Sequence, residues 1–177
     1  MPAALFMALT RTLVRAAVIE TSSPAEALGR VNDLLLPDTQ QGMFVTAVYG
    51  ELDLMEGRFT YVNAGHNPPF LVKGSQVEKL TRTAVALGVM EQPNIRENTL
   101  SLSNGDTVFL YTDGLTEAFS DDGDLFGDER VMNALKSAQT GSVEDVIVAV
   151  EDCLNEFIGT TPLGDDLTML VIKKAVD

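Results

Sequence analysis

The sequence predicts an α/β fold of the α+β kind, in which antiparallel strands are flanked by helices. Apolar residues recur at helical spacing near the start of the chain and again after about residue 128, whereas between residues 43 and 113 they follow strand spacing. The 177 residues are 45% apolar and contain no repeat or linker-like stretch. We therefore expect a single globular domain over residues 1–177 with a core of its own.

The composition narrows the classes of partner. A formal net charge of −14 disfavours nucleic acid and anionic membrane surfaces, which proteins bind through Lys and Arg. Arg11 and Arg15 interrupt the apolar N-terminal stretch, and no run reaches the roughly 18 residues of a membrane helix, so membrane insertion is not expected. The lone Cys153 excludes an intramolecular disulfide and is expected to be a small core residue. A cytoplasmic location follows as the default.

Two helices are predicted at the start of the chain. The first covers residues 2–20 and carries apolar side chains on more than one side, so it needs cover from several neighbours. The second covers residues 24–36. Ser23 suits its N-cap and Glu26 can complete a capping box.

The middle of the chain predicts short antiparallel strands joined by turns. Alternating apolar residues predict a meander of four strands, over residues 43–54, 57–65, 68–73 and 76–80. After a loop near Pro93, residues 95–102 and 106–113 are expected to pair with each other around the turn at 103–105.

The last part of the chain predicts two helices and a closing strand. One helix is expected over residues 128–138 and another over 143–158, where Ser142 and Asp145 form a capping box. The strand lies within residues 165–174.

Acidic residues stand where two of these strands begin and end. Asp113 follows an apolar strand, and Asp165 and Asp166 precede the closing strand. If the two strands are antiparallel neighbours, these carboxylates converge at one edge of the sheet. Such carboxylates repel each other unless a cation lies between them, and Mg²⁺ or Mn²⁺ is the natural partner of oxygen ligands. Gly114 would let the backbone turn sharply beside the ion.

Ordinary turn chemistry explains the same residues. In this interpretation Asp113 caps a turn, Gly114 makes it, and Asp165 and Asp166 belong to a loop. Spacing alone leaves both interpretations open.

Several motifs occur together in the order and spacing of one known family. They are the stretches YTDGLTEAF, LFGDERV, DDLTMLVIK, YVNAGHNPPFLV and MPAALFMA. Together they resemble the bacterial PPM-type serine/threonine phosphatases, and more narrowly the branch of stage II sporulation protein E and the stress-response sigma-regulator phosphatases. The resemblance covers nearly the whole chain. It implies a sandwich of two antiparallel sheets with helices outside.

The resemblance also implies a site and a reaction. Asp113 and Asp165 match the metal-ligating aspartates of the family, and Asp166 occupies the adjoining polar position. Two Mn²⁺ or Mg²⁺ ions would activate a water that attacks the phosphorus of phosphoserine or phosphothreonine. The usual substrate in this branch is a phosphorylated anti-sigma-factor antagonist of the STAS type. The alternative is a non-catalytic pseudophosphatase that binds such a partner without hydrolysing it.

Two further features are open. His66, the lone histidine, either lies at the edge of the site or is a turn residue whose ring bonds the backbone between Gly65 and Pro68. The acidic segment over residues 120–124 is expected to be a mobile surface loop beside the site, and its spacing does not match a calcium loop.

The resemblance has a gap at its N-terminal edge. Family members carry a GGD-x-x-D motif and then a D-x-S-G-x-G motif before MPAALxM, whereas this sequence begins at that Met. We therefore expect roughly the C-terminal three-quarters of a phosphatase domain, missing its N-terminal strands and poorly active, because an absent aspartate is shared by both metals. The helix over residues 2–20 would then keep an uncovered apolar face that favours a homodimer.

Overall fold

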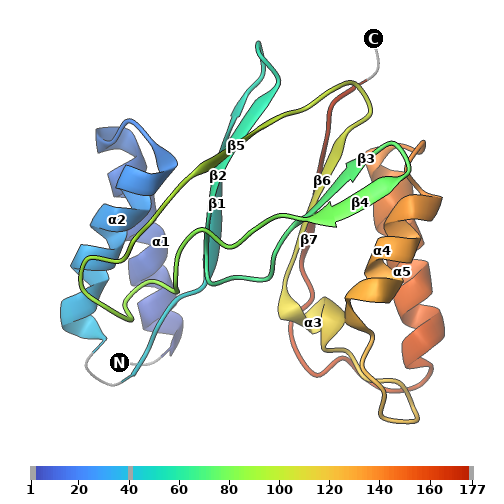
Figure 1. Ribbon diagram of the computed structural model, residues 1–177. Helices are drawn as coiled ribbons and strands as arrows, with labels where there is room; N and C mark the ends of the chain where they lie inside the picture. Colours follow the sequence, from blue (N-terminus) through green and yellow to red (C-terminus); the bar gives the residue numbers. More distant parts are fainter. Residues whose placement is uncertain (1–2, 40–41, 176–177) are drawn as a thin grey trace. The chain divides into compact units, whose positions relative to one another are not determined.

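The computed structural model describes residues 3–39 and 42–175. The chain divides into two compact units, which we call unit 1 (Met1–His66 and Thr81–Ser101) and unit 2 (Asn67–Leu80 and Leu102–Asp177). In the described residues, unit 1 has a three-stranded sheet of order β1-β2-β5, and unit 2 has a four-stranded sheet of order β4-β3-β6-β7 (Figure 1). Each unit has a hydrophobic core of its own.

Unit 1 begins with the two predicted helices, α1 (Ala3–Glu20) and α2 (Pro24–Leu35), and the latter continues as the short 3₁₀ helix η1 (Leu36–Asp38). The predicted first residue of α1, Pro2, lies outside the described residues. Ser23 is the N-cap of α2, as predicted. The carboxylate of Glu26 accepts from the backbone N–H of Ser22, and not from that of the cap residue, so the expected capping box is displaced by one residue.

The core of unit 1 lies between α1, α2 and the sheet. Its fully buried members include Leu28, Val31 and Leu35 of α2 and Val62 of β2. On α1, Leu5 and Ile19 remain exposed, at 57% and 84%. The homodimer contact expected from this surface stays a prediction.

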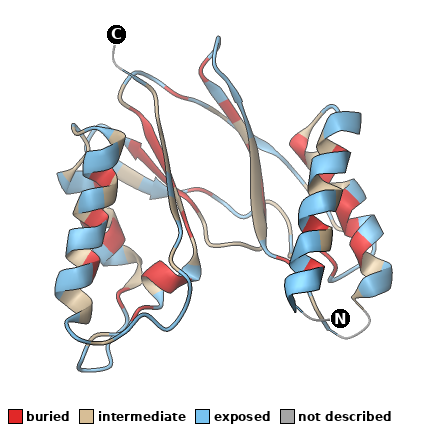
Figure 2. Ribbon diagram, turned by 180° about the vertical axis from the view of Figure 1, so that it is seen from behind, coloured by how far each residue is buried: buried red, intermediate tan, exposed pale blue. Residues whose placement is uncertain are grey.

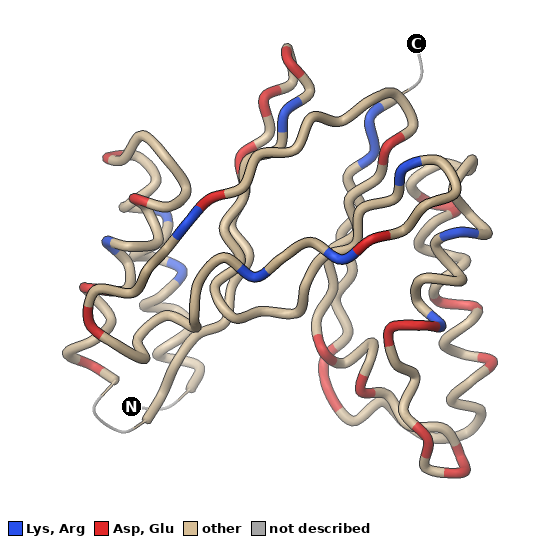
Figure 3. Tube along the Cα trace, in the orientation of Figure 1, with Lys and Arg blue, Asp and Glu red and all other residues tan. Residues whose placement is uncertain are grey.

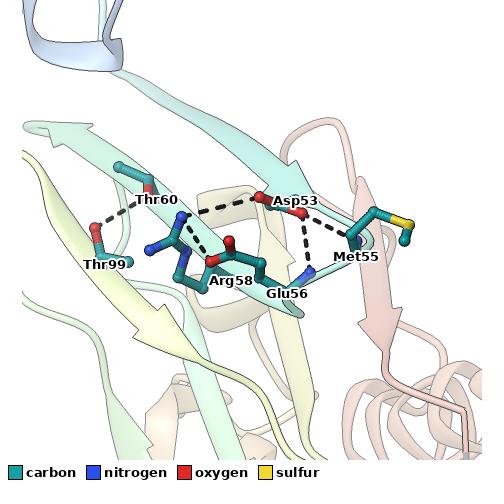
Figure 4. Close-up of polar contacts among 6 residues, drawn as sticks. All are labelled: Asp53, Met55, Glu56, Arg58, Thr60 and Thr99. Atoms are coloured by element: carbon teal, nitrogen blue, oxygen red, sulfur yellow. Dashed lines mark hydrogen bonds and ion pairs between the residues drawn. The ribbon is translucent and has the colours of Figure 1, made fainter.

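The sheet of unit 1 is built around a hairpin of β1 (Ala47–Asp53) and β2 (Arg58–Ala64), and β5 (Asn98–Ser101) pairs with the other edge of β2. At the hairpin turn, the Asp53 carboxylate accepts from the backbone N–H groups of Met55 and Glu56, at 2.9 and 3.0 Å (Figure 4). Arg58 forms ion pairs with Asp53 and Glu56 beside this turn. The charged side chains of this turn therefore pair with one another and with the backbone of the turn.

Unit 2 contains the four-stranded sheet, and each of its strands is antiparallel to its neighbours. The strands are β3 (Phe70–Lys73), β4 (Gln76–Lys79), β6 (Thr107–Tyr111) and β7 (Met169–Lys173). Its helices are α3 (Asp113–Thr116), α4 (Gly127–Ser137) and α5 (Val143–Ile158). Buried segments recur along one side of α4 and α5 (Figure 2). Those residues pack with β3 and β6 in a single cluster.

The predicted start of α5 is confirmed in detail. Ser142 and Asp145 form a reciprocal capping box, with bonds of 2.7 and 3.1 Å, and the helix covers the predicted residues 143–158. Cys153 is partly buried and packs against the core, as expected. In the described part of the chain, no helix is long and apolar enough to cross a bilayer.

The predicted strand partners are wrong in two places. The strands β2 and β3 belong to separate sheets, so the first four strands are not one meander, and β5 pairs with β2 instead of β6. A turn signal indicates a change of direction but not the next partner. The strands β5 and β6 differ in burial. β6 is almost wholly buried and lies between β3 and β7, whereas β5 is largely exposed and lies at the edge of its sheet.

Candidate functional site

The candidate site lies where β6 ends and β7 begins. These strands are antiparallel neighbours, and their last pair on this side is Tyr111 with Met169. Asp113 therefore follows β6 at the same edge at which Asp165 and Asp166 precede β7, as the sequence predicted (Figure 1). Figure 3 draws the Asp and Glu positions in red, and red stretches occur in the part of the trace that Figure 1 labels around α3.

Thr112 joins the two chain segments beyond the ladder. Its backbone N–H donates to the carbonyl of Thr168 at 3.1 Å, and its hydroxyl accepts from the backbone N–H of Thr168 at 2.9 Å. The same hydroxyl donates to the carbonyl of Asp166 at 2.8 Å. The sequence analysis did not predict this contact. The signal available in the sequence was a threonine near each acidic segment, Thr112 beside Asp113 and Thr168 shortly after Asp166.

Gly114 provides a second close contact. A Cβ atom at this position would lie 2.6 Å from the carbonyl oxygen of Asp166 and 3.1 Å from that of Asp165. Gly114 lies in the first turn of α3 and is not among the glycines with a positive φ angle, so the turn from β6 into α3 does not depend on the conformational freedom of glycine. Its role is to let the segment after β6 lie against the backbone of residues 165–166.

The carboxylates of this edge have few protein partners. Asp113 Oδ1 accepts from the N–H of Gly114 at 3.1 Å, and Asp165 Oδ1 accepts from the N–H of Asp166 at 2.7 Å. All three aspartates are exposed, and within residues 3–39 and 42–175 no Lys, Arg or His side chain forms an ion pair with them. The edge therefore presents negatively charged oxygens whose charge no neighbouring side chain neutralises.

These donors suit a hard divalent cation. Mg²⁺ is usually held by one or two carboxylates, with water and substrate phosphate completing its coordination. Within the described residues, no group of three or more His, Cys, Asp and Glu side chains is placed to hold a metal by itself. A cation at this edge would therefore take part of its coordination from water or phosphate, and Gly114 lets the backbone after β6 lie against the backbone of residues 165–166.

The end of β6 is held in place by its neighbours. The ring of Tyr111 stacks with Phe70 and Phe109, at centroid distances of 5.5 and 5.8 Å. Its hydroxyl donates to Asp128 at 3.1 Å, and Asp128 is paired with Lys79 of β4. Asp113 thus lies two positions after a residue that is fixed by both the core and α4.

His66 lies in unit 1. Its ring Nδ1 is 3.0 Å from the hydroxyl of Thr46, and its backbone N–H donates to Asn63 Oδ1 at 2.8 Å. The ring partner is therefore a side chain and not the neighbouring backbone, which corrects one of the two interpretations of this residue. The other, a place at the edge of the site, stays a prediction.

The acidic loop over residues 120–124 is exposed, as expected, but it is anchored. Asp121 accepts from the hydroxyls of Thr160 and Thr161, at 3.1 and 2.7 Å. The Thr161 hydroxyl, followed by the backbone N–H of Thr160, lowers the pKa of Asp121 below its usual value. Mobility of the loop stays a prediction, and its acidic side chains are not all free.

Comparison with known families and proteins places these features in context. The family described as "Stage II sporulation protein E (SpoIIE)" matches residues 1–175. Phosphoserine phosphatase RsbU of Bacillus subtilis (strain 168) is 24% identical over 177 residues, which cover 99% of this chain and 52% of RsbU. Protein IcfG of Synechocystis sp. is 29% identical over 131 residues, 73% of this chain and 20% of IcfG. The chain thus spans about half or less of these relatives.

Solved structures confirm the fold. The SiaA-PP2C domain of Pseudomonas aeruginosa matches with a TM-score of 0.83 and 24% identity, over 98% of this chain and 70% of that one. The structure of the RsbU and RsbW domains of Rv1364c from Mycobacterium tuberculosis matches with a TM-score of 0.78 and 26% identity, over 98% of this chain and 48% of that one. The expected PP2C-like (PPM) fold, with antiparallel sheets and flanking helices, is therefore correct.

Proposed function

Because the chain belongs to the SpoIIE family of PPM-type protein serine/threonine phosphatase domains, we propose that it catalyses metal-dependent dephosphorylation of phosphoserine or phosphothreonine on a protein. The observation that carries the proposal is the meeting of Asp113 with the Asp165–Asp166 segment at the ends of paired strands. No neighbouring cationic side chain pairs with these carboxylates in the described part of the chain.

Each residue of the edge has a separate role in this proposal. Asp113 and Asp165 would hold Mn²⁺ or Mg²⁺, because their carboxylates end the two paired strands. Asp166 and Gly114 would position them, since the carbonyl of Asp166 is bound by Thr112 and lies against Gly114. When bound, divalent cations neutralise charge on a phosphoryl group and activate water at neutral pH, and PPM phosphatases generally use them.

The relatives suggest the class of substrate. One is named a phosphoserine phosphatase, and another solved structure joins RsbU and RsbW domains in one protein. We infer that the substrate is a phosphorylated STAS-type anti-sigma-factor antagonist and that the protein acts in the cytoplasm as part of sigma-factor regulation. The net charge of −14 agrees with a protein substrate over a nucleic acid.

Release of inorganic phosphate from phosphopeptides tests the proposal. The protein is assayed with a phosphoserine peptide and a phosphotyrosine peptide of the same sequence, in Mn²⁺ and in EDTA. We expect release from phosphoserine in Mn²⁺ and none in EDTA. Equal release in EDTA would contradict a metal-dependent site. Binding of the phosphoserine peptide without any release in Mn²⁺ would instead identify a pseudophosphatase.

A further inference from the structure

Unit 1 contains a polar pocket that takes no part in the proposed reaction. It lies along the segment that leads into β5 and has a volume of about 380 Å³. Its lining consists of Thr81, Arg82, Thr83, Asn94, Arg96 and Asn98. The lining thus holds two arginines, two threonines and two asparagines but no carboxylate, in a chain whose net charge is −14.

Hydrogen bonds orient the two arginines of this lining. The backbone N–H of Arg96 donates to the carbonyl of Thr83 at 3.2 Å, which joins the two segments of the lining. Arg82 Nε donates to the carbonyl of His66 at 3.0 Å, and Arg96 Nε donates to Asn94 Oδ1 at 3.4 Å. Each guanidinium is therefore oriented through Nε, and its terminal nitrogens keep their hydrogens for a ligand.

The hydroxyls of the lining are also disposed to donate. Thr81 Oγ1 accepts from Asn98 Nδ2 at 2.9 Å, and Thr83 Oγ1 accepts from the backbone N–H of Asn63 at 3.0 Å. Because each oxygen already accepts a bond, its own hydrogen is left to donate. The pocket therefore offers several donors from different side chains.

Unlike Arg30 and Arg58, these two arginines have no carboxylate partner in the part of the chain that the structure describes. Arg58 pairs with Asp53 and Glu56 at the hairpin turn (Figure 4), and Arg30 pairs with Glu20. Among the residues that the structure describes, neither Arg82 nor Arg96 forms an ion pair. Two unneutralised guanidinium groups in one pocket favour a ligand with at least two negative oxygens.

We propose that this pocket binds a phosphate group carried by a protein. Guanidinium groups hold phosphate through paired N–H bonds, and the threonine and asparagine side chains can donate to the remaining oxygens. The volume exceeds that of one phosphate ion, so the residue that carries the phosphate also fits. All six lining residues belong to unit 1, and the proposal does not depend on the proposed catalysis.

Direct binding tests the pocket. The purified protein is titrated calorimetrically, in EDTA, with inorganic phosphate, with a phosphoserine peptide and with the same peptide unphosphorylated. We expect Arg82→Gln and Arg96→Gln each to weaken binding of the phosphopeptide by about tenfold or more, because a hydrogen bond to a charged group is lost. Arg15→Gln, an equal change of charge at an exposed position of α1, should bind like the wild type. Arg82→Lys should fall between, since it keeps the charge and loses the fork.

The binding results either support or overturn the proposed phosphate site. Tighter binding of the phosphopeptide than of free phosphate, lost in the folded double variant, supports the proposal. Equal binding of the phosphorylated and unphosphorylated peptides would overturn it, as would wild-type affinity in the double variant. Melting curves establish that each variant is folded. Asp113→Asn should leave this affinity unchanged, so failure of the proposed catalysis and failure of this site are distinguishable.

Discussion

Unit 2 uses aspartate in two different ways. One group, at the ends of β6 and β7, comprises Asp113, Asp165 and Asp166. The other group lies around α5 and comprises Asp145, in its first turn, and Asp121, which contacts the segment after its last turn. Both groups are exposed, so exposure does not distinguish them.

The difference lies in what each carboxylate binds. Asp145 accepts from the backbone N–H of Ser142, and Asp121 accepts from Thr160 and Thr161. These donors lower the pKa of Asp145 and of Asp121, first through the Ser142 backbone and the Thr161 hydroxyl. Among the described residues, the carboxylates of Asp113 and Asp165 each accept only from the next backbone N–H. Around α5 the charge therefore holds segments of the fold together, whereas we propose that at the strand ends it binds a ligand.

Neutralising the strand-end carboxylates is the strongest test of the difference between the two groups of aspartates. In Asp113→Asn and Asp165→Asn we expect turnover of a phosphoserine peptide to fall by roughly a hundredfold or more, because divalent cations supply several kcal/mol of charge stabilisation. The melting temperature should change little, since neither carboxylate holds a distant segment. Asp152→Asn, on the exposed side of α5, is the control and should retain full turnover. If an aspartate variant is as active as this control, that aspartate is not part of the site.

The backbone approach at the same edge gives the next largest effect. In Gly114→Ala the added Cβ would meet the carbonyl oxygen of Asp166 at 2.6 Å, so the two segments must separate. We expect a loss of about 1–3 kcal/mol in the free energy of unfolding, by denaturant titration, together with lower turnover. The control is Gly29→Ala in α2, where a Cβ has open space and which should be neutral or slightly stabilised. Equal stability of both variants would mean that the contact is not restrictive.

Much of this edge could be predicted from the sequence, because it depends on local patterns. The apolar stretch before Asp113 and the one after Asp165 predict two strands. Their antiparallel pairing is a condition of the prediction, and the register of β6 and β7 confirms it. The capping box of α5 is equally local, since Ser142 and Asp145 are three residues apart.

Other features depend on distant parts of the chain and could not be predicted. The partner of β5 is β2, from an earlier part of the chain, and not the strand that follows the turn at 103–105. The bond from Thr112 to Asp166 joins residues 54 positions apart, and the backbone bond from Arg96 to Thr83 joins the two segments of the pocket lining. No local spacing marks such contacts.

Loss of the contact between Ser142 and Asp145 at the start of α5 should lower stability and leave turnover unchanged. In Ser142→Ala the N-cap bond to the backbone N–H of Asp145 is lost, and we expect a loss of about 1 kcal/mol in the free energy of unfolding. Turnover should stay at the wild-type level, because the cap holds no part of the β6–β7 edge. Ser142→Asp is the matched variant and should regain most of the stability, since aspartate is also a good N-cap. A drop in turnover with normal stability would place this cap in the site.

The smallest expected effect is a pH dependence from Asp121. Its pKa is lowered in the folded protein, so its contribution to stability is present at pH values above the usual carboxyl pKa of about 3.9 and is lost as the pH falls through the folded value. Asp121→Asn should therefore melt below the wild type at pH 7 and approach it near pH 3. Asp122→Asn, its neighbour in the loop, is the control. A difference between Asp121→Asn and wild type that is equal at both pH values would argue against an ionised carboxylate at this contact.

Direct measurement of Mn²⁺ binding is the most decisive test of the claim that the strand ends hold a metal. Calorimetric titration of the purified protein with Mn²⁺ compares the wild type with Asp113→Asn, Asp165→Asn and the control Asp152→Asn. The account predicts saturable binding in the wild type and in the control, and binding at least tenfold weaker in each strand-end variant, because the bond of a hard cation to a carboxylate is lost. Equal affinity in all four proteins would contradict it and would place any metal elsewhere in the chain.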